Sequence, residues 1–183
     1  MKASEVPILS DSIMSLLPII TLPDPVLRKV SDPVEGIDAG LKRLVADMFE
    51  TMYDAPGIGL AAIQVGVPKR LVVLDVSEED GVKAPLVLIN PKILRLGAET
   101  RVYEEGCLSL PEVRFDIERP STLTLAYQDL DGRSHEIEAD GLLATAIQHE
   151  VDHLDGKLII DFLTRLKRDM VIRKFKKQAR TSE

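Results

Sequence analysis

Two histidines and a glutamate stand within five residues of one another in the segment His149-Glu150-Val151-Asp152-His153. Residues four apart lie about 40° apart around an α-helix, so both imidazoles can reach one metal ion. Glu150 lies about 60° from His153 around the helix axis, close enough to act on a metal-activated water without being a ligand. A divalent metal lowers the pKa of its water to about 7, and a carboxylate can then accept the proton. The motif predicts a metal-dependent hydrolytic site; the alternative is a pair of surface histidines on an unrelated helix.

The residues before this motif extend the same helical face. Their spacing of i, i+3, i+4 and i+7 is typical of one side of a helix, and the residues are Leu142, Thr145, Ala146 and His149. Asp140-Gly141 is a typical helix start and Gly156 a typical helix stop. Small residues on this face would leave room beside a metal, whereas the alternative interpretation is a plain core face.

A two-histidine site needs a third protein ligand and a position left open for water. Cys107 is the single cysteine of the chain. A free cysteine is most often a small buried hydrophobe, but a Cys/His/His set is a recognised catalytic type. The remaining histidine, His135, stands in a polar predicted strand and is expected to face solvent.

Three segments carry a family resemblance. They are GIGLAAIQ at residues 57–64, EGCLS at residues 105–109 and QHEVDH at residues 148–153. In this order they resemble the three signature segments of the peptide deformylases, and the chain also resembles the bacterial subclass that ends in a C-terminal helix. The resemblance extends from about Leu17 to the C-terminus; residues 1–13 lie outside it, and Met14 is a candidate alternative start.

The resemblance implies an activity, hydrolysis of the N-terminal formyl group of formyl-methionine on newly synthesised polypeptides. The implied ligands of one Fe2+ ion, for which Zn2+, Ni2+ or Co2+ can substitute, are Cys107, His149 and His153. Glu150 would act as general base and then as general acid. The side-chain amide of Gln64 and the backbone N–H of Leu108 would stabilise the oxyanion.

The resemblance also implies a substrate pocket. The methionine side chain would lie against Ile58, Leu142, Thr145 and Ala146. Backbone groups of Ile58 and Gly59 would pair with the extended peptide as an added strand, and Arg114 would contact the substrate backbone. Asp152 is expected to orient the site by pairing with Arg119.

Size and composition place these residues in one catalytic domain spanning residues 1–183. No run of 18 apolar residues predicts a transmembrane helix, so no membrane partner is expected. The apolar segment 13–22 is short and follows acidic residues, which argues against a secretory leader. A single cysteine suits a reducing compartment, and a cytoplasmic monomer is expected.

The net charge of −7 is unevenly distributed. Residues 164–183, predicted as a basic C-terminal helix, carry +6, so the remainder carries −13. Such a segment predicts an anionic partner, and for an enzyme acting on new polypeptides that partner would be the ribosome near its exit tunnel. The alternative is a solvated helix face. Its apolar residues at partly helical spacing would dock on the protein body or on the ribosome, and they are Leu166, Met170, Val171 and Phe175.

Periodicity along the chain predicts the fold class. Helical spacing covers residues 37–53 and 141–154, with a last helix from about Phe162. Predicted strands are 70–76, 85–90, 99–104, and a hairpin of 122–128 with 133–138 around Asp131-Gly132. This order predicts an α+β fold with mixed, mostly antiparallel β-sheets packed around a central HExxH helix.

Two other functions use the same motif differently. A zinc-dependent peptidase would need a third ligand after the helix, for which Asp155 and Asp161 are the candidates. A catalytically inactive relative would bind peptide N-termini or ribosomes without turnover.

Overall fold

The computed structural model describes residues 15–77 and 82–181, so the predicted extension at residues 1–13 lies outside the described residues. The α-helices are α1 (Ala39–Asp54), α2 (Gly141–Leu154) and α3 (Arg165–Thr181). Short 3₁₀ helices are η1 (Pro25–Arg28), η2 (Ala62–Val65) and η3 (Ile159–Phe162). The strands are β1 (Gly59–Ala61), β2 (Leu71–Leu74), β3 (Leu86–Leu96), β4 (Thr100–Cys107), β5 (Leu110–Pro120), β6 (Thr122–Gln128) and β7 (Ser134–Asp140).

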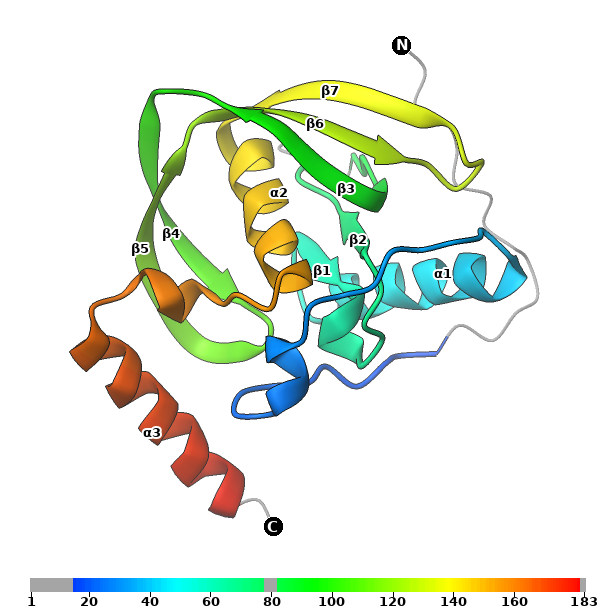
Figure 1. Cartoon of the computed structure of the whole chain (residues 1–183). Helices are drawn as coiled ribbons and strands as arrows, with labels where there is room; N and C mark the ends of the chain where they lie inside the picture. The colour runs from blue at the N-terminus through cyan, green and yellow to red at the C-terminus, as the bar shows by residue number, and fades with distance from the viewer. Residues whose placement is uncertain (1–14, 78–81, 182–183) are drawn as a thin grey trace.

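The strands form two sheets that surround α2. One sheet has five antiparallel strands in the order β1-β2-β3-β6-β7, and the other is a two-stranded antiparallel ribbon of β4 and β5. Helix α2 lies between the five-stranded sheet and the ribbon, and α1 packs against β1 and β2 (Figure 1). The predicted α+β fold with sheets around the HExxH helix is therefore confirmed.

Helix α2 is buried around most of its circumference. Ten of its residues are buried, and these include the polar Gln148, His149, Glu150 and His153 as well as apolar side chains such as Ile147. The predicted start of this helix at Asp140-Gly141 and its stop before Gly156 are confirmed. Gly156 has a φ of 72°, and a Cβ there would lie 2.5 Å from the carbonyl oxygen of Arg28, so only glycine fits where the chain leaves the helix.

The ribbon was only partly predicted. The expected strand at 99–104 continues to Cys107, and β5 was not predicted. The five-stranded sheet also differs, since the strand predicted at 85–90 continues to Leu96 and the short β1 was missed. In β5, exposed charges alternate with apolar residues from Val113 to Glu118, which is the period-two pattern of a strand, so the sequence carried a strand signal that was missed. The strand pairs with β4, and that hairpin places the EGCLS segment at its turn.

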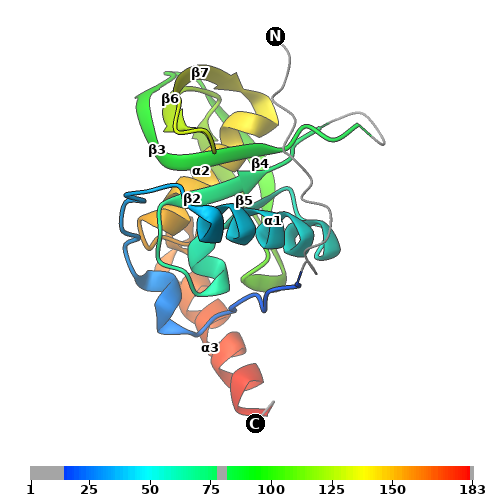
Figure 2. The same cartoon turned by 90° about the vertical axis from the view of Figure 1, so that its right-hand side faces the viewer.

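Helix α3 projects from the body of the protein and packs on it with one side (Figure 2). Phe175 is buried in an apolar cluster with Leu27 and Leu110, and Val171 packs against the same cluster. Leu166 and Met170, which share the remaining side, are exposed. The helix begins at Arg165, because residues 159–162 form η3 instead of the predicted first turn. In the part of the chain that the structure describes, no helix is both long and apolar enough to cross a membrane.

Candidate metal centre and active site

Three ligand-type side chains converge beside α2. Cys107 ends β4, while His149 and His153 lie one helical turn apart on α2. Their ligand atoms all lie within 4.8 Å of one another, and Cys107 Sγ is 3.2 Å from His153 Nε2. A thiol and two imidazoles held this closely fit a metal such as zinc or iron, with room left for a fourth ligand. The candidates of the alternative peptidase site lie elsewhere, since Asp155 pairs with Arg70 and Asp161 with Arg28.

The two histidines are buried together, and their pKa values move in opposite directions. Burial lowers the pKa of His149, but its hydrogen bonds with Cys107 and Glu105 outweigh burial and raise it well above its usual value. Burial and the neighbouring charge of His149 lower the pKa of His153 well below its usual value. A metal ligand binds in its deprotonated form, so the raised pKa of His149 opposes metal binding at this site.

A carboxylate on β4 fixes the orientation of His149. His149 Nδ1 lies 2.9 Å from Glu105 Oε2. Burial alone would raise the pKa of Glu105, but hydrogen bonds from His149 and Arg119 lower it, so the carboxylate is ionised and can only accept. Nδ1 must then donate, which leaves Nε2 as the nitrogen available to a metal.

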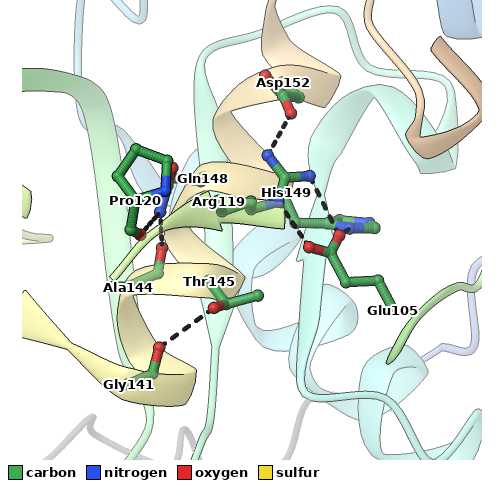
Figure 3. A network of polar contacts seen from close by, with 9 residues as sticks. All are labelled: Glu105, Arg119, Pro120, Gly141, Ala144, Thr145, Gln148, His149 and Asp152. Carbon is green, nitrogen blue, oxygen red and sulfur yellow. Dashed lines mark hydrogen bonds and ion pairs between the residues drawn. The ribbon is translucent and has the colours of Figure 1, made fainter. Parts of the chain in front are cut away.

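The same carboxylate belongs to a buried ionic network (Figure 3). Arg119 donates from Nε to Glu105 Oε1 at 2.6 Å and from Nη2 to Glu105 Oε2 at 3.1 Å. Its Nη1 donates to Asp152 Oδ2 at 2.8 Å, so the predicted pairing of Asp152 with Arg119 is confirmed. Glu105 itself was missed as a functional residue, although it lies inside the EGCLS segment. No local pattern shows that it faces a histidine 44 residues away.

Gln64 lies beside the ligand set with its amide held at both ends. Its Oε1 accepts from the backbone N–H of Ala61 at 2.9 Å, and its Nε2 donates to Ser109 Oγ at 3.0 Å. Nε2 is also 3.7 Å from Cys107 Sγ. The side chain is almost fully buried, so the amide N–H group is preorganised toward the metal side of the cavity.

Glu150 is a buried carboxyl group on the other side of the ligand set. Its Oε2 has no hydrogen-bond partner among the described residues. Burial is the main reason that its pKa is raised to about 7. A nearby divalent cation favours the ionised form, so metal binding would lower this pKa. The absence of a Cβ at Gly59 makes room for this group, because a Cβ there would lie 2.5 Å from Glu150 Oε1.

A cavity of about 790 Å³ opens onto this centre. It is bounded by β1, which forms an edge of the five-stranded sheet, by the β4–β5 hairpin and by the first turns of α2. The structure brings together along it the predicted residues Ile58, Gly59, Gln64, Cys107, Leu108, Arg114, Leu142, Thr145, Ala146, His149 and Glu150. Arg114 lies at the exposed rim, 3.9 Å from Glu104. His135 is not part of this centre and pairs with Asp129 on the β6–β7 hairpin.

Known proteins share this fold and sequence. Residues 16–169 match the family described as Polypeptide deformylase. A peptide deformylase of Rhizobium meliloti (strain 1021) is 61% identical over 168 residues, which cover 92% of this chain and 97% of that protein. The crystal structure of the Ehrlichia chaffeensis peptide deformylase superposes with a TM-score of 0.86 at 42% identity, covering 92% of this chain and 99% of that one. A second structure of that protein, in complex with actinonin, gives 0.86 at 44% identity over 90% and 98% of the two chains.

The chain belongs to the polypeptide deformylase family. It is an enzyme that removes the N-terminal formyl group from the formyl-methionine of newly synthesised polypeptides, and this hydrolysis depends on a metal ion.

Replacement of Cys107 tests the ligand set. We expect Cys107→Ser to lose its metal far faster than the native protein, because a hydroxyl is a much poorer partner than a thiolate for these ions. Metal content after dialysis against a chelator measures this. Ser31→Ala, a buried serine outside the centre, is the control and should retain its metal. A Cys107→Ser protein that keeps a full equivalent of metal would place the third ligand elsewhere.

Proposed function

We propose that Cys107, His149 and His153 hold a single Fe2+ ion, for which Zn2+, Ni2+ or Co2+ can substitute. The observation that carries this proposal is the convergence of the three ligand atoms within 4.8 Å, beside a buried carboxyl group with an unpartnered oxygen. When bound, the metal supplies a nucleophilic water at neutral pH and positive charge beside the formyl oxygen. Imidazole and thiolate donors suit each of these metals, and Fe2+ follows from the family resemblance.

Glu150 is the proton carrier in this proposal. Its free Oε2 accepts a proton from the attacking water and later delivers it to the departing amine of methionine. Burial raises its pKa to about 7 before a metal binds, and the bound metal would lower that pKa, so the carboxylate is ionised and able to accept a proton when the water attacks.

Two N–H donors serve the oxyanion that forms on the formyl oxygen. One is Gln64 Nε2, which Ala61 and Ser109 hold in place through the two ends of the amide. The other is the backbone N–H of Leu108, in the hairpin turn next to Cys107. Donors fixed before the reaction stabilise the developing charge without having to reorganise.

Residues of the cavity walls bind the rest of the substrate. Ile58, Leu142, Thr145 and Ala146 form the apolar slot for the methionine side chain. β1 has β2 on only one side, so its other edge is available to pair with an extended peptide through Ile58 and Gly59. Arg114 at the rim then contacts the peptide backbone.

A turnover assay on formyl-Met-Ala with anaerobically purified, metal-loaded protein tests this function. Release of formate with the Met-Ala bond left intact supports it. Cleavage within a longer formylated peptide would instead support a peptidase, and binding without turnover would support an inactive relative.

Replacement of Glu150 tests whether this residue transfers a proton or binds the metal. We expect Glu150→Gln to keep its metal and to lose turnover by about 10² to 10⁴, the usual contribution of a general acid–base group. Metal analysis and kinetics on the same preparation decide the matter. Loss of the metal together with activity would move Glu150 into the ligand set.

Gly59→Ala tests whether the reaction depends on the position of the Glu150 carboxyl group. The new Cβ would lie 2.5 Å from Glu150 Oε1 and 2.8 Å from Leu74 Cδ2, so Glu150 must move. A displacement of this size lowers turnover by about 10²-fold, while the metal remains bound. Gly36→Ala is the matched control, because its Cβ would meet nothing within 4 Å. Unchanged kinetics in Gly59→Ala would mean that the position of Glu150 does not limit the reaction.

We propose further that the whole chain acts as one catalytic domain and as a cytoplasmic monomer at the ribosome near its exit tunnel. The support is the basic segment at residues 164–183, most of whose cationic side chains are exposed on α3. Leu166 and Met170 are exposed on the same helix, whereas Phe175 and Val171 are used in packing on the body. Ribosomal RNA phosphates can attract such a surface without sequence-specific contacts.

Charge reversal tests this contact better than truncation, because removing α3 would also remove Phe175 from the core. We expect Arg173→Glu, Lys174→Glu and Lys177→Glu together to weaken ribosome binding by about tenfold or more, with a smaller salt dependence. Turnover on short formyl peptides should be unchanged. The control is reversal of three exposed cations on the body, Lys29, Lys42 and Arg101. Equal binding by the two triple variants would leave α3 with a structural role only.

A further inference from the structure

An aromatic ring lies over the buried arginine of the ionic network. The ring centroid of Phe162 is 4.7 Å from Arg119 Cζ. Phe162 ends η3 and remains 48% exposed, whereas Arg119 is only 4% exposed. A guanidinium within about 6 Å of a ring centroid is attracted by the negative face of the ring, more strongly when water is excluded.

The position of Phe162 is fixed by its neighbours in η3. Ile159 and Ile160 are buried in the apolar cluster below. Asp161 accepts the backbone N–H of Leu158 at 2.9 Å and forms a two-pronged ion pair with Arg28. These contacts hold the backbone of η3, from which the ring of Phe162 reaches the face of Arg119.

Arg119 is engaged in its plane by carboxylates. Nε and Nη2 donate to Glu105, and Nη1 donates to Asp152. These contacts occupy the edge of the guanidinium, so the ring of Phe162 covers a face that the carboxylates leave open. Ion pairs gain strength where water is excluded, so the cover strengthens the pair between Arg119 and Glu105.

Glu105 is also the group that accepts His149 Nδ1–H. A partner that holds the second nitrogen of a ligating histidine fixes the ring and its tautomer, and the loss of such partners typically lowers metal affinity or activity about 10- to 100-fold. From Phe162 to His149 the contacts run through Arg119 and Glu105 without a gap.

We propose that Phe162 is a positioning residue for the metal centre, acting through Arg119 and Glu105 on His149. Its ring shields the Arg119–Glu105 ion pair from water and so keeps the imidazole of His149 in a metal-ready orientation. The proposal rests on the ligand role proposed for His149. Phe162 does not line the substrate cavity, so its effect falls on metal retention and kcat and not on substrate binding.

The test compares three variants of the metal-loaded enzyme. Phe162→Leu keeps an apolar side chain but removes the aromatic face, Phe162→Tyr keeps the face, and Leu94→Ala changes an apolar residue of β3 that is about as exposed as Phe162. We expect Phe162→Leu to release its metal to a chelator about 3- to 10-fold faster than the native enzyme, with kcat reduced and KM unchanged. Phe162→Tyr and Leu94→Ala should match the native enzyme in all three quantities.

A double-mutant cycle with Arg119→Lys tests whether Phe162 acts on the metal centre through Arg119. A compact ammonium cannot reproduce the planar fork and its stacking, so Phe162→Leu should change metal release much less in that background. Additive effects in the cycle, a Leu variant equal to native, or a Tyr variant as impaired as Leu would each overturn the proposal. A native protein that binds no metal at all would instead overturn the proposed function, so the two failures are distinguishable.

Discussion

The enclosure of a polar helix is the constraint on which the rest of this structure depends. α2 buries His149, Glu150 and His153 among apolar neighbours such as Ile147. Burial of an ionisable group is unfavourable unless a partner compensates it, and breaking such a buried pair is strongly destabilising. Glu105 and Arg119, which lie on the two-stranded sheet of β4 and β5, provide such partners for α2. Without this ionic network, a sequence with so many polar residues on one helix would not favour its burial.

Within the described part of the chain, some buried polar groups of the site have a partner and others do not. His149 has its carboxylate, and Asp152 has its arginine. Glu150 has an oxygen with no partner among the described residues, and its pKa is raised accordingly. The network thus keeps the ligand side of the helix rigid and leaves one carboxyl group free to exchange a proton. The two environments lie side by side on α2, since Glu150 directly follows His149.

Local sequence signals were sufficient where local geometry decides the structure. Gly141 and Gly156 mark the ends of α2 because both have positive φ values, and Asp131-Gly132 marks the β6–β7 hairpin for a similar reason. The HExxH spacing likewise predicted that His149, Glu150 and His153 lie together, and the family resemblance predicted the other residues of the cavity, although their catalytic roles remain proposals. In the two-stranded ribbon, β5 was missed although apolar and charged residues alternate from Val113 to Glu118, and its pairing with β4 shows the strand directly.

Long-range contacts were beyond any local pattern, and the one that was predicted, Asp152 with Arg119, was expected alongside the family resemblance. Glu105 meets a histidine 44 residues further along the chain, and the Arg119 that binds it lies on β5, the strand that was not predicted. Phe162 was expected only as the start of a helix, and its contact with Arg119 depends on how η3 crosses the ribbon. Sequence alone can specify which groups are present, but these partnerships depend on the approach of separate elements.

The ribbon of β4 and β5 has no hydrogen-bonded neighbour among the other strands of the described chain. An isolated two-stranded hairpin is marginally stable in water, so the ribbon needs attachments elsewhere. Two of these are Glu105–His149 and Arg119–Asp152, the same contacts that organise the chemistry. The contacts that organise the metal centre therefore also hold the β4–β5 hairpin against α2. A substitution that weakens the Glu105–His149 contact therefore affects both the metal centre and the attachment of the ribbon to α2.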